Sequence, residues 1–404
     1  MNILGLLLIV TQLVTDAPST EVYLTGTYGQ STYAIDGDRN GGFSVQANSI
    51  FDIDSVHRVF GEASYTWNQS HGNRFVENAD YDILSPYLTV DTVGGGMRTE
   101  TYFFRGGYRM NMHNVVWYTA LQFRALQSYR AVDPRPKNKV ADLRFEAGVG
   151  YTNNTYSWLV AGEIGRYKQN NDIKFYSELG ESQIYHLVGP GTAYTRFSGN
   201  KKESYYYGLT AGATVAMMPH DQGWLAEVDY QYLRVTKELH DNTFVPIGRI
   251  QTHAVEGAFG YVAPSWQAVL LGGIFFRRGA QYIYGEAVNN SYEFLTLQHN
   301  FAENGWHIGA EGNYNLELPI GEMTFNAAID YNESNTASLD TEPRWKELYG
   351  MLTEDVVSAS AYVRYAFPIK GRFSWFFEPA ADYCYYTNTT RQSWQVALHT
   401  GIVF

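Results

Sequence analysis

The sequence predicts one transmembrane antiparallel up-and-down β-barrel, all-β, of about sixteen strands, with roughly fourteen to eighteen as the allowed range. Three observations predict this fold. Apolar and polar residues alternate over segments of about 10–13 residues, which is the length a tilted strand needs to cross a membrane. The connections between these segments alternate between short and long, and Trp and Tyr recur near the segment ends.

The composition agrees with many exposed strands, because the 404 residues include 33 Tyr and 38 Gly. Beyond the N-terminus no apolar stretch reaches about 18 residues, so a helical membrane protein is excluded. The net charge of −12 argues against nucleic acid as a partner, because a phosphate backbone binds a basic surface. The single cysteine, Cys384, excludes an intrachain disulfide and is interpreted as a small strand residue.

Residues 1–18 are predicted to be a signal-like or truncated N-terminal segment, and residues 19–404 the barrel. The apolar run at residues 3–10 suits the apolar region of a secretory signal. However, no Lys or Arg precedes it, and Asp16-Ala17-Pro18 is a poor cleavage site. The alternative is a retained N-terminal segment.

The alternating segments begin near residues 22, 41, 57, 100, 115, 141, 156, 204, 222, 249, 265, 304, 321, 355, 371 and 390. Short turns are expected near Asp54, His113, Asn153, Pro219, Pro264, Pro319 and Lys370. Longer loops are expected at 71–99, 128–140, 168–203, 236–248, 278–303 and 333–354. Since outer-membrane barrels have short periplasmic turns and long outer loops, the long loops are expected outside the cell.

The last segment carries the pattern most clearly and ends on Phe404, which we interpret as the signal that the barrel assembly machinery reads. One face of that strand consists of Trp394, Val396, Leu398, Thr400, Ile402 and Phe404. Aromatic rings favour the headgroup level of a bilayer. One aromatic girdle is therefore expected beside the short turns, at Trp117, Trp158, Trp224, Trp266 and Trp375.

Charged residues on inward positions form two groups. A basic arc on the third to sixth strands comprises Arg58, Arg105, Arg109, Arg124 and Arg144. An acidic arc on later strands comprises Glu163, Glu227, Asp229, Glu256, Glu311 and Asp330. Across a water-filled pore the arcs would set up a transverse field that orders polar solutes. The alternative is a closed lumen filled by ion pairs, since buried charges must pair.

The third outer loop, at residues 130–139, contains Asp133-Pro134-Arg135-Pro136. Two prolines stiffen this loop, and four basic residues surround its one acid. Three interpretations are open: it folds inward and narrows a pore, it binds anionic surface sugar, or it is a solvated rigid loop.

No signature of a soluble enzyme is present: the sequence lacks a P-loop, a dinucleotide glycine motif, HExxH and CxxC. His253 falls on the apolar face, and His307 is expected to face inward beside Glu311. We interpret both as structural. The sequence therefore predicts neither a catalytic residue nor a metal site nor a cofactor, and an enzyme acting on lipid or peptide is the least favoured hypothesis.

Several short motifs resemble a family of outer-membrane β-barrel proteins of Bacteroidota, catalogued as a domain of unknown function. They are Thr99-Glu100-Thr101-Tyr102-Phe103, the loop at residues 133–136 followed by Asn138, and the terminal aromatic strand. The resemblance covers most of the chain and implies a bacterial outer-membrane barrel without an assigned substrate. It implies no catalytic residues.

The favoured function is a channel, or a transport-associated protein, for small polar solutes with a charge-lined lumen. The alternative is a non-transporting accessory or scaffold barrel whose long outer loops bind a lipoprotein or receptor partner. The apolar stretches at 282–284 and 292–295 suit such a partner. In the channel hypothesis the inward charges are solvated, so neutralising Arg105, Arg109 and Arg144 should strengthen a preference for cations and barely change stability.

Overall fold

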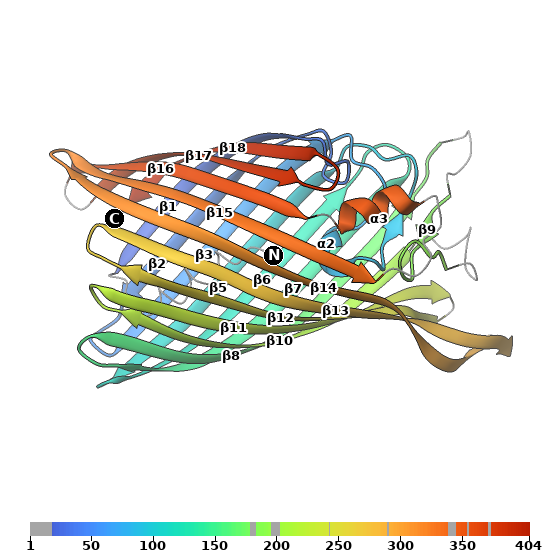
Figure 1. Ribbon diagram of the computed structural model, residues 1–404, viewed down its shortest axis with the longest axis horizontal. Coiled ribbons are helices and arrows are strands. Elements are labelled where there is room, and N and C mark those ends of the chain that lie inside the picture. Colours follow the sequence, from blue (N-terminus) through green and yellow to red (C-terminus); the bar gives the residue numbers. More distant parts are fainter. Residues whose placement is uncertain are drawn as a thin grey trace.

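In the residues that the computed structural model describes, sixteen long strands close into one antiparallel barrel (Figure 1). These residues are 18–177, 183–194, 203–241, 243–288, 291–337, 345–353, 355–370 and 373–404. Each barrel strand pairs with its neighbours along the chain, and the first pairs with the last. The predicted fold class is confirmed.

The barrel strands are β1 (Ser19–Ser31), β2 (Arg39–Asp52), β3 (His57–His71), β5 (Arg98–Met112), β6 (Val115–Tyr129), β7 (Arg135–Thr152), β8 (Tyr156–Lys174), β10 (Glu203–Pro219), β11 (Gly223–Asp241), β12 (Thr243–Val262), β13 (Trp266–Val288), β14 (Ser291–Leu318), β15 (Gly321–Ala337), β16 (Val356–Lys370), β17 (Phe373–Tyr386) and β18 (Arg391–Val403). Two short strands form a separate sheet, β4 (Thr89–Val90) and β9 (Tyr185–His186). The described helices are α2 (Tyr81–Leu84) and α3 (Lys346–Leu352). Neither is long and apolar enough to cross a membrane.

The barrel closes where β1 meets β18. Their register runs from Glu21↔Val403 to Ser31↔Ser393. Thr20 and Phe404 exchange two backbone hydrogen bonds of 2.8 Å, so the terminal aromatic residue takes part in the closure. Apart from Pro18, the signal-like segment lies outside the described residues.

The predicted faces are also confirmed. On β11, Trp224 and Val228 are exposed on the outside, whereas Leu225, Glu227 and Asp229 are buried inside. The expected girdle beside the short turns points outward, with Trp117 50% exposed. The rest of that girdle is also exposed, at Trp158, Trp224, Trp266 and Trp375. A closed barrel with an apolar outer belt and aromatic girdles is the bacterial outer-membrane type.

Strands continue into most of the predicted loops, and three of these loops illustrate the error. β7 begins at Arg135, inside the predicted loop 128–140. β11 and β12 pair across most of 236–248, and β13 and β14 pair across most of 278–303. In the last two loops, aromatic and β-branched residues such as Phe244, Val245, Tyr282, Ile283 and Tyr284 favour strands whether or not lipid surrounds them. The β13–β14 hairpin consequently projects beyond the other strands in Figure 1.

Candidate functional site

Two connecting segments at the long-loop end fold into the mouth of the barrel. Residues 72–97, between β3 and β5, carry α2 and β4, and residues 183–194, between β8 and β10, carry β9. The two segments pair through Thr89↔His186 and Val90↔Tyr185. We call them together the plug.

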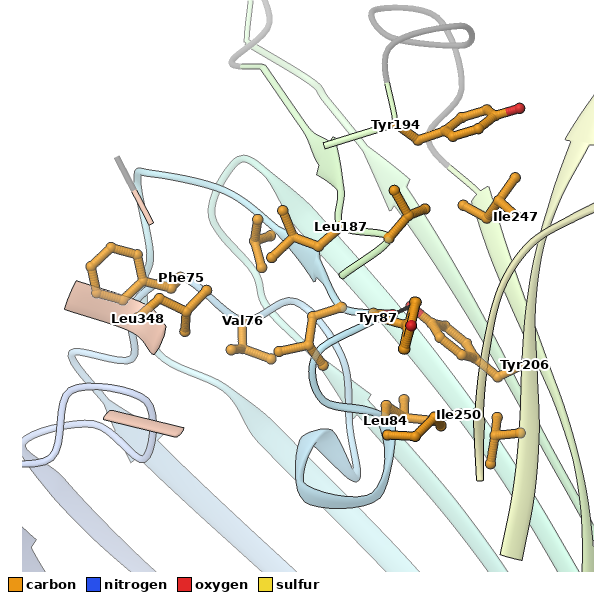
Figure 2. Close-up of a cluster of buried hydrophobic side chains, with 14 of the residues drawn as sticks. Phe75, Val76, Leu84, Tyr87, Leu187, Tyr194, Tyr206, Ile247, Ile250 and Leu348 are labelled. Carbon is orange, nitrogen blue, oxygen red and sulfur yellow. Dashed lines mark hydrogen bonds between the residues drawn. The ribbon is translucent and has the colours of Figure 1, made fainter. Parts of the chain in front are cut away.

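The plug is held first by apolar packing. Five of its apolar side chains are completely buried: Leu84, Leu88, Val90, Leu187 and Val188. They pack in one cluster with inward side chains of β7, β8, β10, β11 and β12, which we call the plugged wall. Figure 2 shows Leu84 and Tyr87 beside Tyr206 and Ile250 of this wall. Full burial of one large apolar side chain is worth about 1.5–3 kcal/mol, so this contact holds the plug firmly.

A buried ion triad adds a second attachment. The guanidinium of Arg130 contacts Glu77 at 2.7 Å and Asp91 at 3.0 Å, and all three side chains are at most 1% exposed. Asn138 and Asn171, from β7 and β8, each donate a 2.7 Å hydrogen bond to the carbonyl of Glu77. Burial raises the pKa of Glu77 well above its usual value, and the attraction of Arg130 opposes that rise.

Side chains of the barrel also hold the plug's backbone. Lys237 of β11, which is 1% exposed, donates from Nζ to the carbonyl of Leu88 at 2.6 Å and that of Leu187 at 3.3 Å. Asn300 of β14 donates to the carbonyl of Val188 at 2.6 Å and accepts from the Tyr87 hydroxyl at 2.8 Å. These bonds satisfy carbonyls that burial would otherwise leave unpaired.

The basic arc lies on the inner face, as predicted, but its charges do not face the acidic arc across open water. The arginines pair locally: Arg58 with Asp52 (2.5 Å), Arg105 with Glu146 (2.8 Å), Arg124 with Asp80 of the plug (2.6 Å), and Arg144 with Asp142 (3.1 Å). The Arg109 guanidinium donates to Asn111 at 2.8 Å. The prediction that these charges face each other unpaired across water is therefore wrong. Neighbouring strands lie about 4.8 Å apart, so long side chains reach a partner on the wall itself.

The acidic arc is dispersed over several local contacts. Glu163 contacts Arg144 at 3.4 Å, and the Asp229 carboxylate accepts from Thr214 at 2.6 Å. Glu227 is buried on the same strand as Asp229, and Glu311 accepts from Asn326 at 2.7 Å.

The partners of His307 differ from the prediction. Its ring contacts Glu256 and Asp330, the latter at 3.1 Å, whereas the sequence suggested Glu311. The sequence could not show this, because Asp330 lies on the neighbouring strand β15 and Glu256 on β12, two strands away from β14. Among the described residues no group of three or more His, Cys, Asp or Glu is placed to hold a metal ion.

The segment Asp133–Pro136 joins the ends of two hairpins. Asp133 accepts from Arg135 and from the backbone nitrogens of Tyr176 and Ser177, each at 2.6 Å. The Arg135 guanidinium lies 4.4 Å from the centre of the Tyr176 ring. Since β7 begins at Arg135, half of the expected loop is strand. This segment does not enter the mouth. Residues 72–97, for which the sequence predicts only a long outer loop, fold into it. The apolar residues of 81–90 were the signal that could have revealed the plug.

The plug leaves space on the opposite side of the mouth. A cavity of about 370 Å³ lies between the plug and the inner faces of β17, β18, β1, β2 and β3, which we call the polar wall; β5 and β6 complete its lining. Hydroxyl, amide and carboxylate groups line most of it: Ser31, Asp36, Asn40, Asn68, Ser70, Asn73, Asn78, Asp80, Thr99, Ser128, Asp382, Ser393 and Gln395. Tyr81 and Cys384 also border it.

The two walls differ in solvent exposure below the mouth as well. On the polar wall, inward side chains such as Gln46, Glu62 and His399 are half-buried. On the plugged wall, Leu225 is 0% and Glu227 5% exposed. Water therefore reaches the lumen along the polar wall, while the plugged wall is largely filled.

Comparison with known proteins adds a family. Solved structures with a similar fold include a FadL homologue of Pseudomonas aeruginosa (10% identity, 96% of this chain and 89% of that chain, TM-score 0.45). Others are BauA, a ferric preacinetobactin receptor of Acinetobacter baumannii (9%, 96% and 80%, TM-score 0.38), and CdiB of the same species (8%, 95% and 60%, TM-score 0.43).

No curated protein matches the chain. A family match, in contrast, extends over residues 10–346, which is most of the sequence. The chain belongs to a family of unknown function, DUF6850.

Proposed function

We propose that this barrel is a channel for small polar solutes whose long-loop mouth is narrowed by the plug. The observation that carries the proposal is the cavity of about 370 Å³ between the plug and the polar wall. Solutes that enter there pass hydroxyl and amide groups and then the half-buried inner face of β18, β1, β2 and β3.

The attachment of the plug to one side supports a fixed constriction. Most of its apolar side chains, the Arg130 triad and Lys237 attach it to β6 and the plugged wall, and Asn300 attaches it to β14. On the side of the cavity the plug contacts the connection between β1 and β2, where the Asn73 amide donates to the Ile35 carbonyl at 2.9 Å and the Tyr81 hydroxyl donates to Asp36 at 2.6 Å. The cavity lies below these contacts, beside polar side chains of β1, β2 and β18. A channel of this kind needs a plug that stays in place and a passage beside it, rather than a gate that opens fully.

The direct test is to remove most of the first plug segment, residues 74–94, and to measure conductance in a planar bilayer. Asn73 and Gly95 already pair across the base of the plug, so residues 74–94 can be replaced by two glycines with little effect on β3 and β5. The intact protein should conduct weakly, and the excised variant severalfold more. An intact barrel that conducts no ions, beside an excised one that does, would contradict the channel.

We further propose that the long loops face the cell exterior, the barrel contacts outer-membrane lipid, and the assembly machinery reads the strand ending at Phe404. The Bacteroidota origin implied by the resemblance also stays a prediction. Protease added to intact cells should cut within 168–203 and spare the turn at Pro319. Cleavage at the Pro319 turn alone would show that the orientation is the reverse of the one proposed.

A second candidate is an accessory barrel that holds a lipoprotein or receptor partner. The observation that favours it is the projecting β13–β14 hairpin, where Phe294 is 50% and Leu295 56% exposed. Shortening this hairpin should abolish partner binding and leave ion conductance unchanged if both functions coexist. An intact, non-conducting barrel that loses a partner with the hairpin would favour the accessory role over the channel. No catalytic role is proposed.

A further inference from the structure

The cavity beside the plug has the size and the lining of a small-molecule site. Its volume of about 370 Å³ lies within the range of about 300–1,000 Å³ typical of ligand pockets. Its walls come from both ends of the chain, with Asn40 and Asn68 on one side and Ser393 and Gln395 on the other. A solute on the proposed route would therefore be surrounded by side chains before it reaches the wider lumen.

The charges of the lining exclude one class of solute. None of the described residues that line the cavity is Lys, Arg or His, so an anion would find no counter-charge there. Asp36 and Asp382 add negative charge, whereas Asp80 is paired with Arg124 at 2.6 Å. An anionic solute is consequently repelled.

The neutral groups favour another class. Serine hydroxyls both donate and accept hydrogen bonds, and Asn and Gln amides offer a donor and an acceptor side by side. Carboxylates add acceptors for hydroxyl donors. The cavity also has an apolar component, since Tyr81, Val76 and Leu126 contribute to its lining. The Tyr81 hydroxyl donates to Asp36 at 2.6 Å, which holds its ring in place. Polar edges beside an aromatic ring suit a molecule with many hydroxyls and C–H faces.

We propose that this cavity is a binding subsite for uncharged polyhydroxylated solutes, saccharides in chemical class. The proposal rests on the proposed channel function and names the solute class that the passage holds. A small organic cation, drawn by the carboxylates alone, is the competing occupant that the test must separate.

The chain's single cysteine provides the readout, because Cys384 borders the cavity. The rate at which uncharged methyl methanethiosulfonate modifies Cys384 is measured by mass spectrometry on the purified barrel. Sucrose should slow modification, by about tenfold when present at ten times its dissociation constant. Gluconate and tetramethylammonium at the same concentrations should leave the rate unchanged.

Matched variants locate the site. Asn68→Leu and Ser393→Ala remove hydrogen-bonding groups from the cavity with little change in side-chain size, so each should weaken the protection by sucrose. Ser374→Ala lies at the other end of β17 and should leave the protection unchanged. Any of three results would overturn the saccharide subsite. These are protection by tetramethylammonium rather than sucrose, equal effects of all three variants, and no modification of Cys384.

This readout is independent of conductance. A barrel that carries no current but whose Cys384 is protected by sucrose would refute the channel and keep the subsite. A conducting barrel without protection would refute the subsite and keep the channel.

Discussion

The two inner walls of this barrel are built from the same alternating strands but have opposite roles. On the plugged wall, inward residues such as Tyr206, Val235 and Ile250 are at most 2% exposed and pack against the plug. On the polar wall, Asn40 and Asn68 occupy inward positions at the same end of the barrel and remain half-buried beside the cavity. The difference lies in the side chains, because inward apolar residues at the mouth of a barrel need a partner segment to cover them.

The comparison shows how a wide barrel can be narrowed without being closed. A plug bound to all strands would fill the mouth, and a plug bound to none would dissociate from it. Attachment to one side leaves a polar passage on the other. Changes on the plugged side should therefore alter docking and stability, and changes on the polar side should alter what passes.

The largest effect is expected from Arg130→Met, which leaves Glu77 and Asp91 buried without a counter-charge. Loss of one partner from a buried ion pair costs about 3–5 kcal/mol. The plug should undock, so proteolysis within 72–97 should accelerate and conductance should rise. Arg135→Met is the matched control, because Arg135 is 41% exposed and pairs outside the plug. Equal proteolysis of the two variants would show that the triad does not hold the plug.

The next effect concerns apolar packing. Leu84→Ala removes a fully buried side chain from the plug and should weaken docking by about 2–5 kcal/mol. Val93→Ala changes the same segment at a residue that is 54% exposed and should have almost no effect. Hydrogen exchange of residues 72–97 would measure both. Similar exchange in the two variants would mean that burial of Leu84 contributes nothing to docking.

A smaller loss of stability is expected when an ion pair of the basic arc is broken. The sequence alone predicts almost no loss for Arg105. Arg105 pairs with Glu146 at 2.8 Å and its side chain is 8% exposed, so Arg105→Met should lower the free energy of unfolding by about 1–3 kcal/mol. Arg58→Met lies beside a turn, where its partner Asp52 is 39% exposed, and should cost under about 1 kcal/mol. Urea unfolding in lipid vesicles tests the order; the reverse order would contradict the pairing.

The smallest effect is a dependence of docking on pH. Burial raises the pKa of Asp36, in the connection before β2, to about 6, and the neighbouring Asp82 adds to this rise. An undocked aspartate has a pKa of about 4, so docking is strongest below about pH 4 and weakens as the pH rises to about 6. Burial shifts Glu77 in the same direction.

Hydrogen exchange of the plug, corrected for intrinsic rates, should therefore be slower at pH 5 than at pH 7.5. Asp36→Asn keeps an acceptor for the Tyr81 hydroxyl and should reduce the difference. Faster exchange at the lower pH would show that the sign is wrong.

The alternation of residues predicted most of the fold because lipid demands an apolar outer face on every strand. β3, β6, β8 and β15 begin at the predicted residues. β12 and β14 begin earlier than predicted, since outside the membrane no such demand maintains the alternation. The plug was missed for a different reason. Its contacts join distant parts of the chain, as when Arg124 pairs with Asp80 and Lys237 binds the carbonyl of Leu88. No periodicity in one segment reveals the partner of another.

The central claim, a passage along the polar wall beside a plug fixed to the opposite side, can be tested with two cysteines. Cys384 borders the cavity, whereas Ser204 on β10 is fully buried and hydrogen-bonds Thr89 of the plug at 2.9 Å. A methanethiosulfonate carrying a bulky trimethylammonium group is applied to the wild type and to Ser204→Cys in a Cys384→Ser background, while current is recorded. The account predicts that modification of Cys384 lowers the current and that the cysteine at position 204 is not modified. Unchanged current after full modification of Cys384, or rapid modification at position 204, would contradict it.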